Sequence, residues 1–158
     1  MISRNFSLCI LMACLPLVAP AQSAPPLPPA ASAPAATRAA DPSLFGDLGG
    51  LPVIRQVVND FVAIMLADER IGFTFKDTNL PRLHEKLVEQ FCLLSGGGCI
   101  YTGDPMKEVH QGLKLTNAHF NALVEDLQLA MDRSGIASRT QNRLLALLAP
   151  MQRDTVTR

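Results

Sequence analysis

Residues 101–112 read YTGDPMKEVHQG. Asp104 and Pro105 are typical of a helix start, because the proline lacks only an N–H that would have no helical partner in the first turn. Gly112 is typical of a helix end, since glycine readily adopts the left-handed conformation found there. The stretch therefore predicts a short helix between two irregular segments, with His110 near its end.

His110 has apolar neighbours on this predicted helix: Met106 four residues before it, Val109 one before it and Leu113 three after it. A buried imidazole costs free energy unless both nitrogens find partners. A flat apolar cofactor with a central iron meets this need, because one nitrogen binds the iron and the other N–H donates to a carbonyl. No second His, Cys or carboxylate stands at ligand spacing on the same helix, which argues against a tetrahedral zinc site.

Apolar residues recur at helical spacing on both sides of this segment, and no strand-like alternation of useful length appears. An aromatic corner, IGFTF, at 71–75 separates two of these helical stretches. The predicted fold class is therefore all-α. The predicted helices run over 52–67, from Asn79 to the glycines at 96–98, from Thr116 to Gly135 as the longest, and from Ser138 with an interruption at Pro150.

Polar residues mark where two of these helices begin. Asn79 is a good N-cap, and Pro81 suits the first turn that follows it. Ser138 and Gln141 have the spacing of a capping box, in which two side chains satisfy the first backbone N–H groups.

Residues 1–21 have the features of a signal peptide: Arg4, an apolar run over 6–18 and the small-residue cleavage pattern APA at 19–21. Export to the periplasm is the expected consequence. A lipoprotein processing site at Cys14, with membrane attachment, is the alternative. The apolar run continues past Cys14, which favours simple cleavage.

Residues 22–42 consist almost entirely of Ala, Pro and Ser, so they lack the large apolar side chains that a core requires and are expected to form a disordered tether. Residues 43–158 then form one small domain. The chain has 14 basic and 14 acidic residues and no basic run, which gives no support for nucleic-acid binding.

Four cysteines divide into two pairs. Cys9 and Cys14 lie in the predicted signal peptide. Cys92 and Cys99 lie seven residues apart across a glycine-rich turn. In an oxidising compartment they form a disulfide if their β-carbons approach closely enough; otherwise they are two independent small apolar residues.

Several short motifs occur together between Leu44 and the C-terminus. They are LGG at 48–50, DF at 60–61, LAD at 66–68, Phe75, TN at 78–79, GG at 96–97, YTG at 101–103 and MKEVHQG at 106–112. With these motifs the chain resembles the group I truncated haemoglobins, which are small bacterial and protist globins. The resemblance implies a truncated globin fold, a two-over-two helical sandwich, with haem b as the cofactor.

The resemblance also implies roles for five residues. His110 is expected to be the proximal iron ligand, Phe75 to stack on the porphyrin, and Met106 to line the proximal face. Lys86 and Tyr101 are expected near the haem propionates, and a lysine that faces solvent is the alternative for Lys86.

The distal pocket departs from the family pattern. The family has a tyrosine directly after Asp-Phe in the first long helix, a glutamine after the Lys of the next helix, and a further position that is frequently polar. These positions hold Val62, Leu87 and Leu83 here, and with Phe61 they predict an apolar distal pocket. A hydrogen bond to a partly anionic ligand contributes about 1.5–3 kcal/mol, so its loss predicts O2 release that is faster by about tenfold or more.

The implied function is reversible binding of a diatomic gas, O2, NO or CO, which includes oxygen transport. Nitric oxide dioxygenase or peroxidase activity is an alternative that needs an unidentified reductase. Haem electron transfer is another, with Lys86 or His84 as a sixth iron ligand. A haem-free helical module fits less well, because an apolar slot does not explain the residues around His110. His119, in the first turn after Thr116, is expected to cap its helix or to lie at the surface.

Overall fold

The structure is a computed structural model that describes residues 42–158. The predicted signal peptide over 1–21 and the predicted tether over 22–42, apart from Pro42, lie outside the described residues. Every regular element of the described part is a helix, which confirms the all-α prediction. The elements are α1 (Pro42–Asp47), α2 (Gly50–Ala67), η1 (Gly72–Phe75), α3 (Leu80–Leu94), α4 (Met106–Val109), α5 (Asn117–Arg133), α6 (Ser138–Leu148), η2 (Ala149–Met151) and α7 (Gln152–Thr155).

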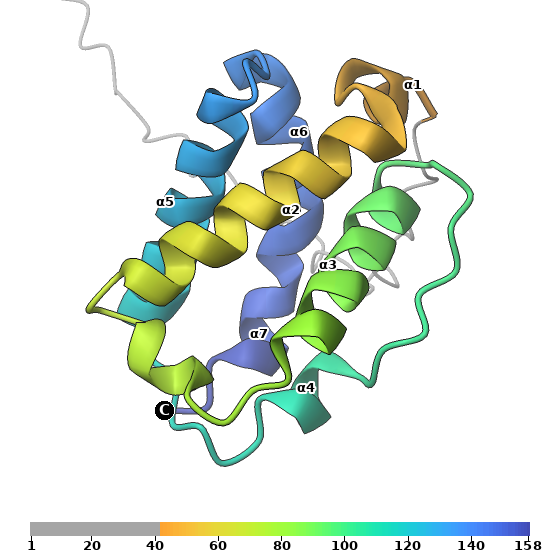
Figure 1. The fold of residues 1–158 in the computed structure, drawn as a ribbon. Coiled ribbons are helices and arrows are strands. Elements are labelled where there is room, and N and C mark those ends of the chain that lie inside the picture. The colour runs from red at the N-terminus through yellow and green to blue at the C-terminus, as the bar shows by residue number, and fades with distance from the viewer. Residues whose placement is uncertain (1–41) are drawn as a thin grey trace, which may run out of the picture. The chain divides into compact units, whose positions relative to one another are not determined.

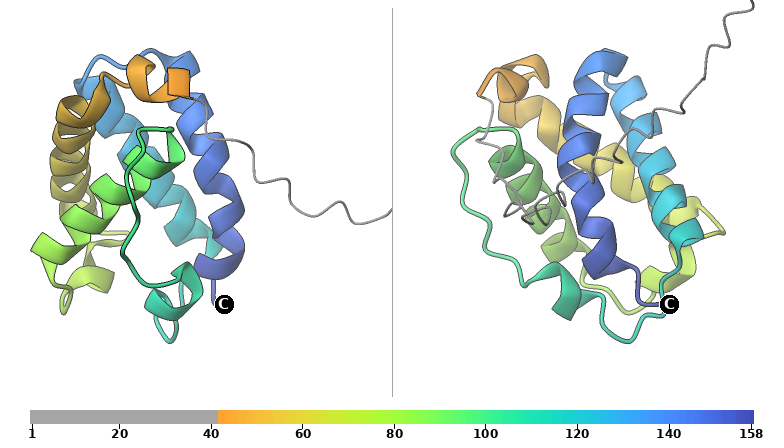
Figure 2. Two further views of the ribbon diagram at one scale, coloured as in Figure 1. Left: turned by 90° about the vertical axis from the view of Figure 1, so that its right-hand side faces the viewer. Right: turned by 180° about the vertical axis from the view of Figure 1, so that it is seen from behind.

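The four long helices form two pairs, α2 with α3 and α5 with α6 (Figure 1, Figure 2). Across the sandwich α2 packs on α5 and α3 packs on α6. This is the two-over-two arrangement that the resemblance to the truncated haemoglobins implies. The short helix α4 lies at one end of the sandwich, where it contacts α7.

The core lies between the two pairs and is built from the apolar stripe of each helix. The rings of Phe61 and Phe91 meet at its centre, with centroids 6.4 Å apart. Burial of each large apolar side chain contributes about 1.5–3 kcal/mol, so this stripe is what holds α2 and α3 together. The buried side chains of the core include Ile54, Val57, Val58, Phe61, Met65, Val88, Phe91, Leu127, Met131 and Leu144.

Two of the predicted helix starts are confirmed by hydrogen bonds. The Asn79 side chain accepts a hydrogen bond from the backbone N–H of Arg82 at 3.1 Å. Thr116 accepts one from the N–H of His119 at 3.3 Å, and the His119 ring accepts one from the N–H of Thr116 at 3.4 Å. His119 thus caps α5, as one of its two predicted roles requires.

Three predictions about the helices differ from the structure: where α2 begins, which helix is longest, and how α6 is capped. α2 begins at Gly50 and has 18 residues, so it is longer than α5, which has 17. The capping box at Ser138 is wrong: Ser138 is already helical, and Ala137 occupies the N-cap without a side-chain hydrogen bond. Gln141 instead donates to Asp132 Oδ1 at 2.6 Å and to the Ile136 carbonyl at 2.8 Å, so it ties α6 to the end of α5.

Candidate functional site

A cavity of about 340 Å³ lies between α2, α3, α4 and α5. It is lined mainly by apolar side chains, with polar groups contributed by α3 and by the residues before α4. Eight residues that the sequence places at a cofactor site all line it: Phe61, Phe75, Leu83, Lys86, Leu87, Tyr101, Met106 and His110.

Val62 is not among the residues that line this cavity, and its place in the distal pocket stays a prediction. It lies directly after Phe61 on α2 and packs, half-buried, against the core. Of the four positions predicted as distal, Phe61, Leu83 and Leu87 line the cavity.

His110 is held by its own helix in a defined tautomer. The α4 helix is a single turn that ends with His110 as its C-cap, shorter than the predicted span from Asp104 to Gly112. His110 Nδ1 lies 2.7 Å from the carbonyl oxygen of Met106. A carbonyl can only accept, so Nδ1 is the donor, and in the neutral imidazole the lone pair is then on Nε2. A neutral imidazole in this tautomer can bind a metal through Nε2.

The cavity wall on α3 follows from helical periodicity. Leu83, Lys86, Leu87 and Gln90 recur at three and four, so they share one face of the helix, and all four line the cavity. His84 lies on another face and is not a lining residue. Its Nε2 is buried without a hydrogen-bond partner in the described part of the chain. The prediction of His84 as an alternative iron ligand therefore has no support from the geometry.

Lys86 is neither solvent-facing nor free. Its side chain is 15% exposed, and Nζ lies 2.9 Å from Glu89 Oε1 and 2.6 Å from Thr102 Oγ1. The Thr102 N–H donates to Glu89 Oε2 at 2.8 Å. This backbone hydrogen bond and the Lys86 ammonium hold the pKa of Glu89 below its usual range. Binding of Lys86 to an iron atom would therefore require Nζ to leave both partners.

Tyr101 and Asp104 complete the polar end of the cavity. The Tyr101 hydroxyl donates to the Asp104 carbonyl oxygen at 3.2 Å, and burial raises the pKa of that hydroxyl. Arg82 pairs with the Asp104 carboxylate at 3.1 Å. The cavity lining thus includes two cations, Arg82 and Lys86, each of which is paired with a carboxylate of the protein.

Residues 95–105 connect α3 to α4 without regular secondary structure and run back alongside α3 (Figure 2). We call this segment the strap. The strap is attached to α3 by the Cys92–Cys99 disulfide, by the hydrogen bonds of Thr102 with Glu89 and Lys86, and by the Arg82–Asp104 ion pair. These attachments and the contact between α4 and α7 together restrict where α4 and His110 lie.

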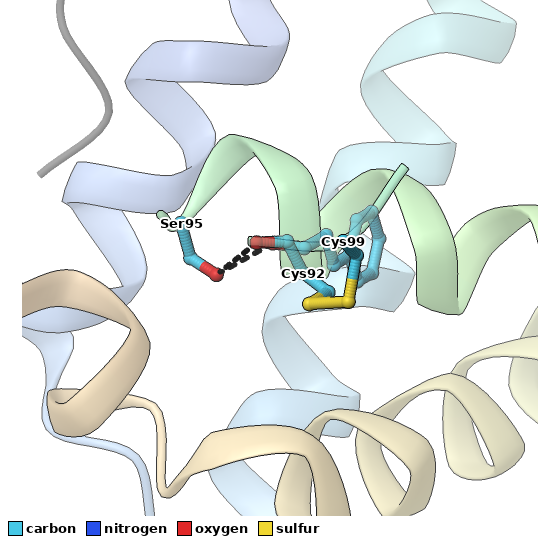
Figure 3. The surroundings of a disulfide bond; sticks show 4 residues. Cys92, Ser95 and Cys99 are labelled. Atoms are coloured by element: carbon cyan, nitrogen blue, oxygen red, sulfur yellow. Dashed lines mark hydrogen bonds between the residues drawn. A yellow bond between two sulfur atoms is a disulfide. The ribbon is translucent and has the colours of Figure 1, made fainter. Parts of the chain in front are cut away.

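The disulfide closes the first turn of the strap. Cys92 and Cys99 have Cα atoms 5.7 Å apart, and Figure 3 shows their sulfurs joined beside the Ser95 hydroxyl, which donates to the Phe91 carbonyl at 2.7 Å. At Gly97 a Cβ atom would lie 2.7 Å from Cys92 Sγ and would overlap the ring of Phe45. Glycine is therefore required where the strap passes over the disulfide.

Gln90 is a lining residue that the sequence analysis missed. Its side chain is buried, and Nε2 lies 3.7 Å from Met106 Sδ and 3.5 Å from Met151 Sδ. Its position in the sequence could have indicated this role, because Gln90 lies three residues after Leu87 on the cavity-facing stripe of α3. A polar residue on that stripe stands out only once the stripe is known to face a cavity.

Within residues 42–158, no group of three or more His, Cys, Asp or Glu side chains is arranged to hold a metal ion. A site with several protein ligands is therefore absent from the described part of the chain. The lone pair of His110 Nε2 suits a metal that arrives with most of its ligands supplied by a cofactor.

A family model described as bacterial-like globin matches residues 43–157 of the chain. The chain is 38% identical over 121 residues to the group 1 truncated hemoglobin GlbN of Mycolicibacterium paratuberculosis, covering 76% of this chain and 89% of that protein. It is 29% identical over 113 residues to the group 1 truncated hemoglobin of Tetrahymena thermophila, covering 72% and 93%.

Solved structures give the same family. The truncated hemoglobin of Tetrahymena pyriformis in its Fe(III) form has a TM-score of 0.70 and 28% identity, covering 73% of this chain and 98% of that one. The 2/2 hemoglobin of Synechococcus sp., in the cyanomet state with covalently attached heme, has a TM-score of 0.68 and 25% identity with the same coverage.

Proposed function

Since the chain belongs to the bacterial-like globin family, we propose that its cavity holds haem b, with His110 as the protein ligand to the iron and a diatomic gas bound opposite. The observation that carries this proposal is the 2.7 Å contact between His110 Nδ1 and the Met106 carbonyl. It leaves Nε2 as the only metal-binding atom of the imidazole and fixes the plane of the ring.

The other lining residues fit the same cofactor. The apolar lining suits the porphyrin face, and Phe75 offers a ring for stacking. Arg82 and Lys86 lie where they can pair with the haem carboxylates. When bound, haem supplies an iron with one coordination position for a gas.

The predicted distal residues favour gases that need little hydrogen bonding. Phe61, Leu83 and Leu87 offer no donor to a bound ligand. Bound O2 carries partial negative charge and gains from a donor, whereas CO gains less. We therefore expect O2 to dissociate quickly, with CO and NO less affected.

The proposal leaves the sixth iron position to the gas or to water. Lys86 is paired with Glu89 and Thr102, and His84 lies off the cavity lining. Ligation by either residue would require it to leave its present contacts. We accordingly expect a five-coordinate ferrous form in the absence of gas.

Reconstitution of the purified protein with haemin tests the proposal. The His110→Ala variant is expected to lose or strongly shift the Soret band, while His84→Ala, which changes a histidine off the cavity lining, keeps the wild-type spectrum. A wild-type spectrum in His110→Ala, or a protein that stays colourless with excess haemin, would refute it. A six-coordinate ferrous spectrum would contradict the expected open position.

We also propose that the protein works outside the cytoplasm. The Cys92–Cys99 disulfide supports this, because such bonds persist mainly in oxidising compartments. The mass of the protein recovered from cells distinguishes cleavage after residue 21 from lipidation at Cys14. The full-length mass, with Met1 retained, would overturn both forms of export.

A further inference from the structure

The amide of Gln90 is buried among sulfur atoms. The side chain is 9% exposed, and its Nε2 contacts the thioethers of Met106 and Met151 at 3.7 and 3.5 Å. Thioether sulfur is a weak hydrogen-bond acceptor. The amide makes no other hydrogen bond within residues 42–158.

Such an amide contributes little to folding. Its desolvation costs free energy that contacts with sulfur recover only in part. An apolar side chain of the same length would fill the space without that cost. We therefore infer that the Gln90 amide serves to orient a neighbouring residue, Met106.

Met106 connects this amide to His110. Its sulfur contacts Gln90 Nε2, and its backbone carbonyl accepts the hydrogen bond from His110 Nδ1 at 2.7 Å. The same carbonyl accepts a hydrogen bond from the His110 backbone N–H at 3.2 Å. Because α4 has only four residues, side-chain contacts also contribute to the position of this carbonyl. The sulfur of Met151, in η2, contacts the same amide nitrogen at 3.5 Å. One side chain of α3 thus joins the two chain segments that flank the cavity beside His110.

We propose that Gln90 is a positioning residue for His110, which it holds through the Met106 side chain in the orientation that binds iron. This inference rests on the proposed role of His110 as the iron ligand. A fixed Met106 carbonyl keeps the Nδ1–H donated, which makes Nε2 more basic and strengthens its bond to the metal. Without the amide, the turn of α4 shifts more freely and the imidazole is held less firmly.

The Gln90→Met variant of the haem-loaded protein tests this. Methionine keeps the length and volume of the side chain and removes the N–H donors. The iron–imidazole stretching frequency of the ferrous form, measured by resonance Raman, is expected to fall. Haem transfer to an excess of apomyoglobin is expected to become about threefold to tenfold faster.

Gln111→Met is the matched control, because Gln111 is the exposed residue directly after His110. It is expected to keep the wild-type frequency and transfer rate. The thermal unfolding temperature of both haem-free variants is expected to stay at or above the wild-type value. A loss of stability in haem-free Gln90→Met, with an unchanged frequency in its loaded form, would show a merely structural role and overturn the proposal.

The Met106→Leu variant tests the same contact from the other side. It removes the sulfur and leaves the backbone carbonyl, so it is expected to lower the frequency as Gln90→Met does. The double variant is expected to add nothing to either single change. Fully additive effects would overturn the proposal.

The His110→Ala variant separates failure of this inference from failure of the proposed function. If His110→Ala loses the Soret band while Gln90→Met keeps the wild-type frequency, only the role of Gln90 is refuted. If His110→Ala keeps the band, the proposed function is refuted as well.

Discussion

The α3 helix and the strap both line the cavity, but different forces hold them. α3 is a capped helix whose inner stripe is buried in the core through Val88 and Phe91. The strap has no regular hydrogen bonding and is attached to α3 by a disulfide, a carboxylate and an ion pair. The α3 wall, which is proposed to face the gas, is positioned by the helical periodicity of its own residues. The position of the strap, which leads to His110, depends instead on a few cross-links to α3.

The largest effect is expected from the core side of α3. Phe91→Ala removes a ring that is 2% exposed and is expected to cost about 3–5 kcal/mol of unfolding free energy. Ile100→Ala in the strap is the matched control, because that side chain is 78% exposed. It is expected to change stability by less than about 0.5 kcal/mol. Urea unfolding measures the unfolding free energy of both variants. An equal loss in Phe91→Ala and Ile100→Ala would contradict the contrast between α3 and the strap.

The disulfide is the next largest contribution, and it belongs to the strap. Cys92→Ala with Cys99→Ala is expected to lower the unfolding free energy by about 2–3 kcal/mol on the chain-entropy estimate. Reduction of the wild-type protein is expected to have a similar effect, whereas the double variant no longer responds to a reductant. Unfolding curves with and without dithiothreitol test this. If the unfolding free energy of the wild-type protein did not change on reduction, the remaining attachments of the strap to α3 would be sufficient for stability.

A hydrogen-bond donor on the α3 wall tests the proposed gas preference. Leu87→Gln is expected to slow O2 dissociation by about tenfold, because a donor to partly anionic O2 contributes about 1.4 kcal/mol or more. CO dissociation is expected to change much less. Leu93→Gln, on the same helix but 42% exposed, is the control. Stopped-flow displacement gives both rates, and an unchanged O2 rate in Leu87→Gln would place the gas elsewhere.

The smallest expected effect depends on pH and concerns Glu89. In the folded state Thr102 and Lys86 lower the pKa of this carboxyl. The ionised carboxylate therefore stabilises the fold, and this stabilisation is fully present above the pKa of the unfolded chain. It is lost as pH falls through the folded value. Glu89→Gln is expected to lessen the loss of stability in mild acid, while Glu85→Gln, with a side chain that is 66% exposed, does not. Thermal unfolding between neutral pH and about pH 3 measures this, and parallel curves for wild type and Glu89→Gln would contradict it.

Sequence reasoning succeeded where the physics is local. The Asn79 cap and the stripe of α3 depend on residues within one turn of each other, so they can be read from spacing. It failed at Ser138 and Gln141, because Gln141 finds a better partner in Asp132 across the turn between two helices. It also missed Gln90, whose partners Met106 and Met151 lie far away in the chain.

The sequence by itself determined the helices, the all-α class and a histidine on an apolar turn, since these follow from periodicity and nearest neighbours. Only the tertiary structure decided that Cys92 and Cys99 meet, that Lys86 is engaged by Glu89 and Thr102, and that Gln90 lies against Met106 and Met151. Each of these outcomes depends on a distance or a direction between segments, which spacing along the chain does not contain.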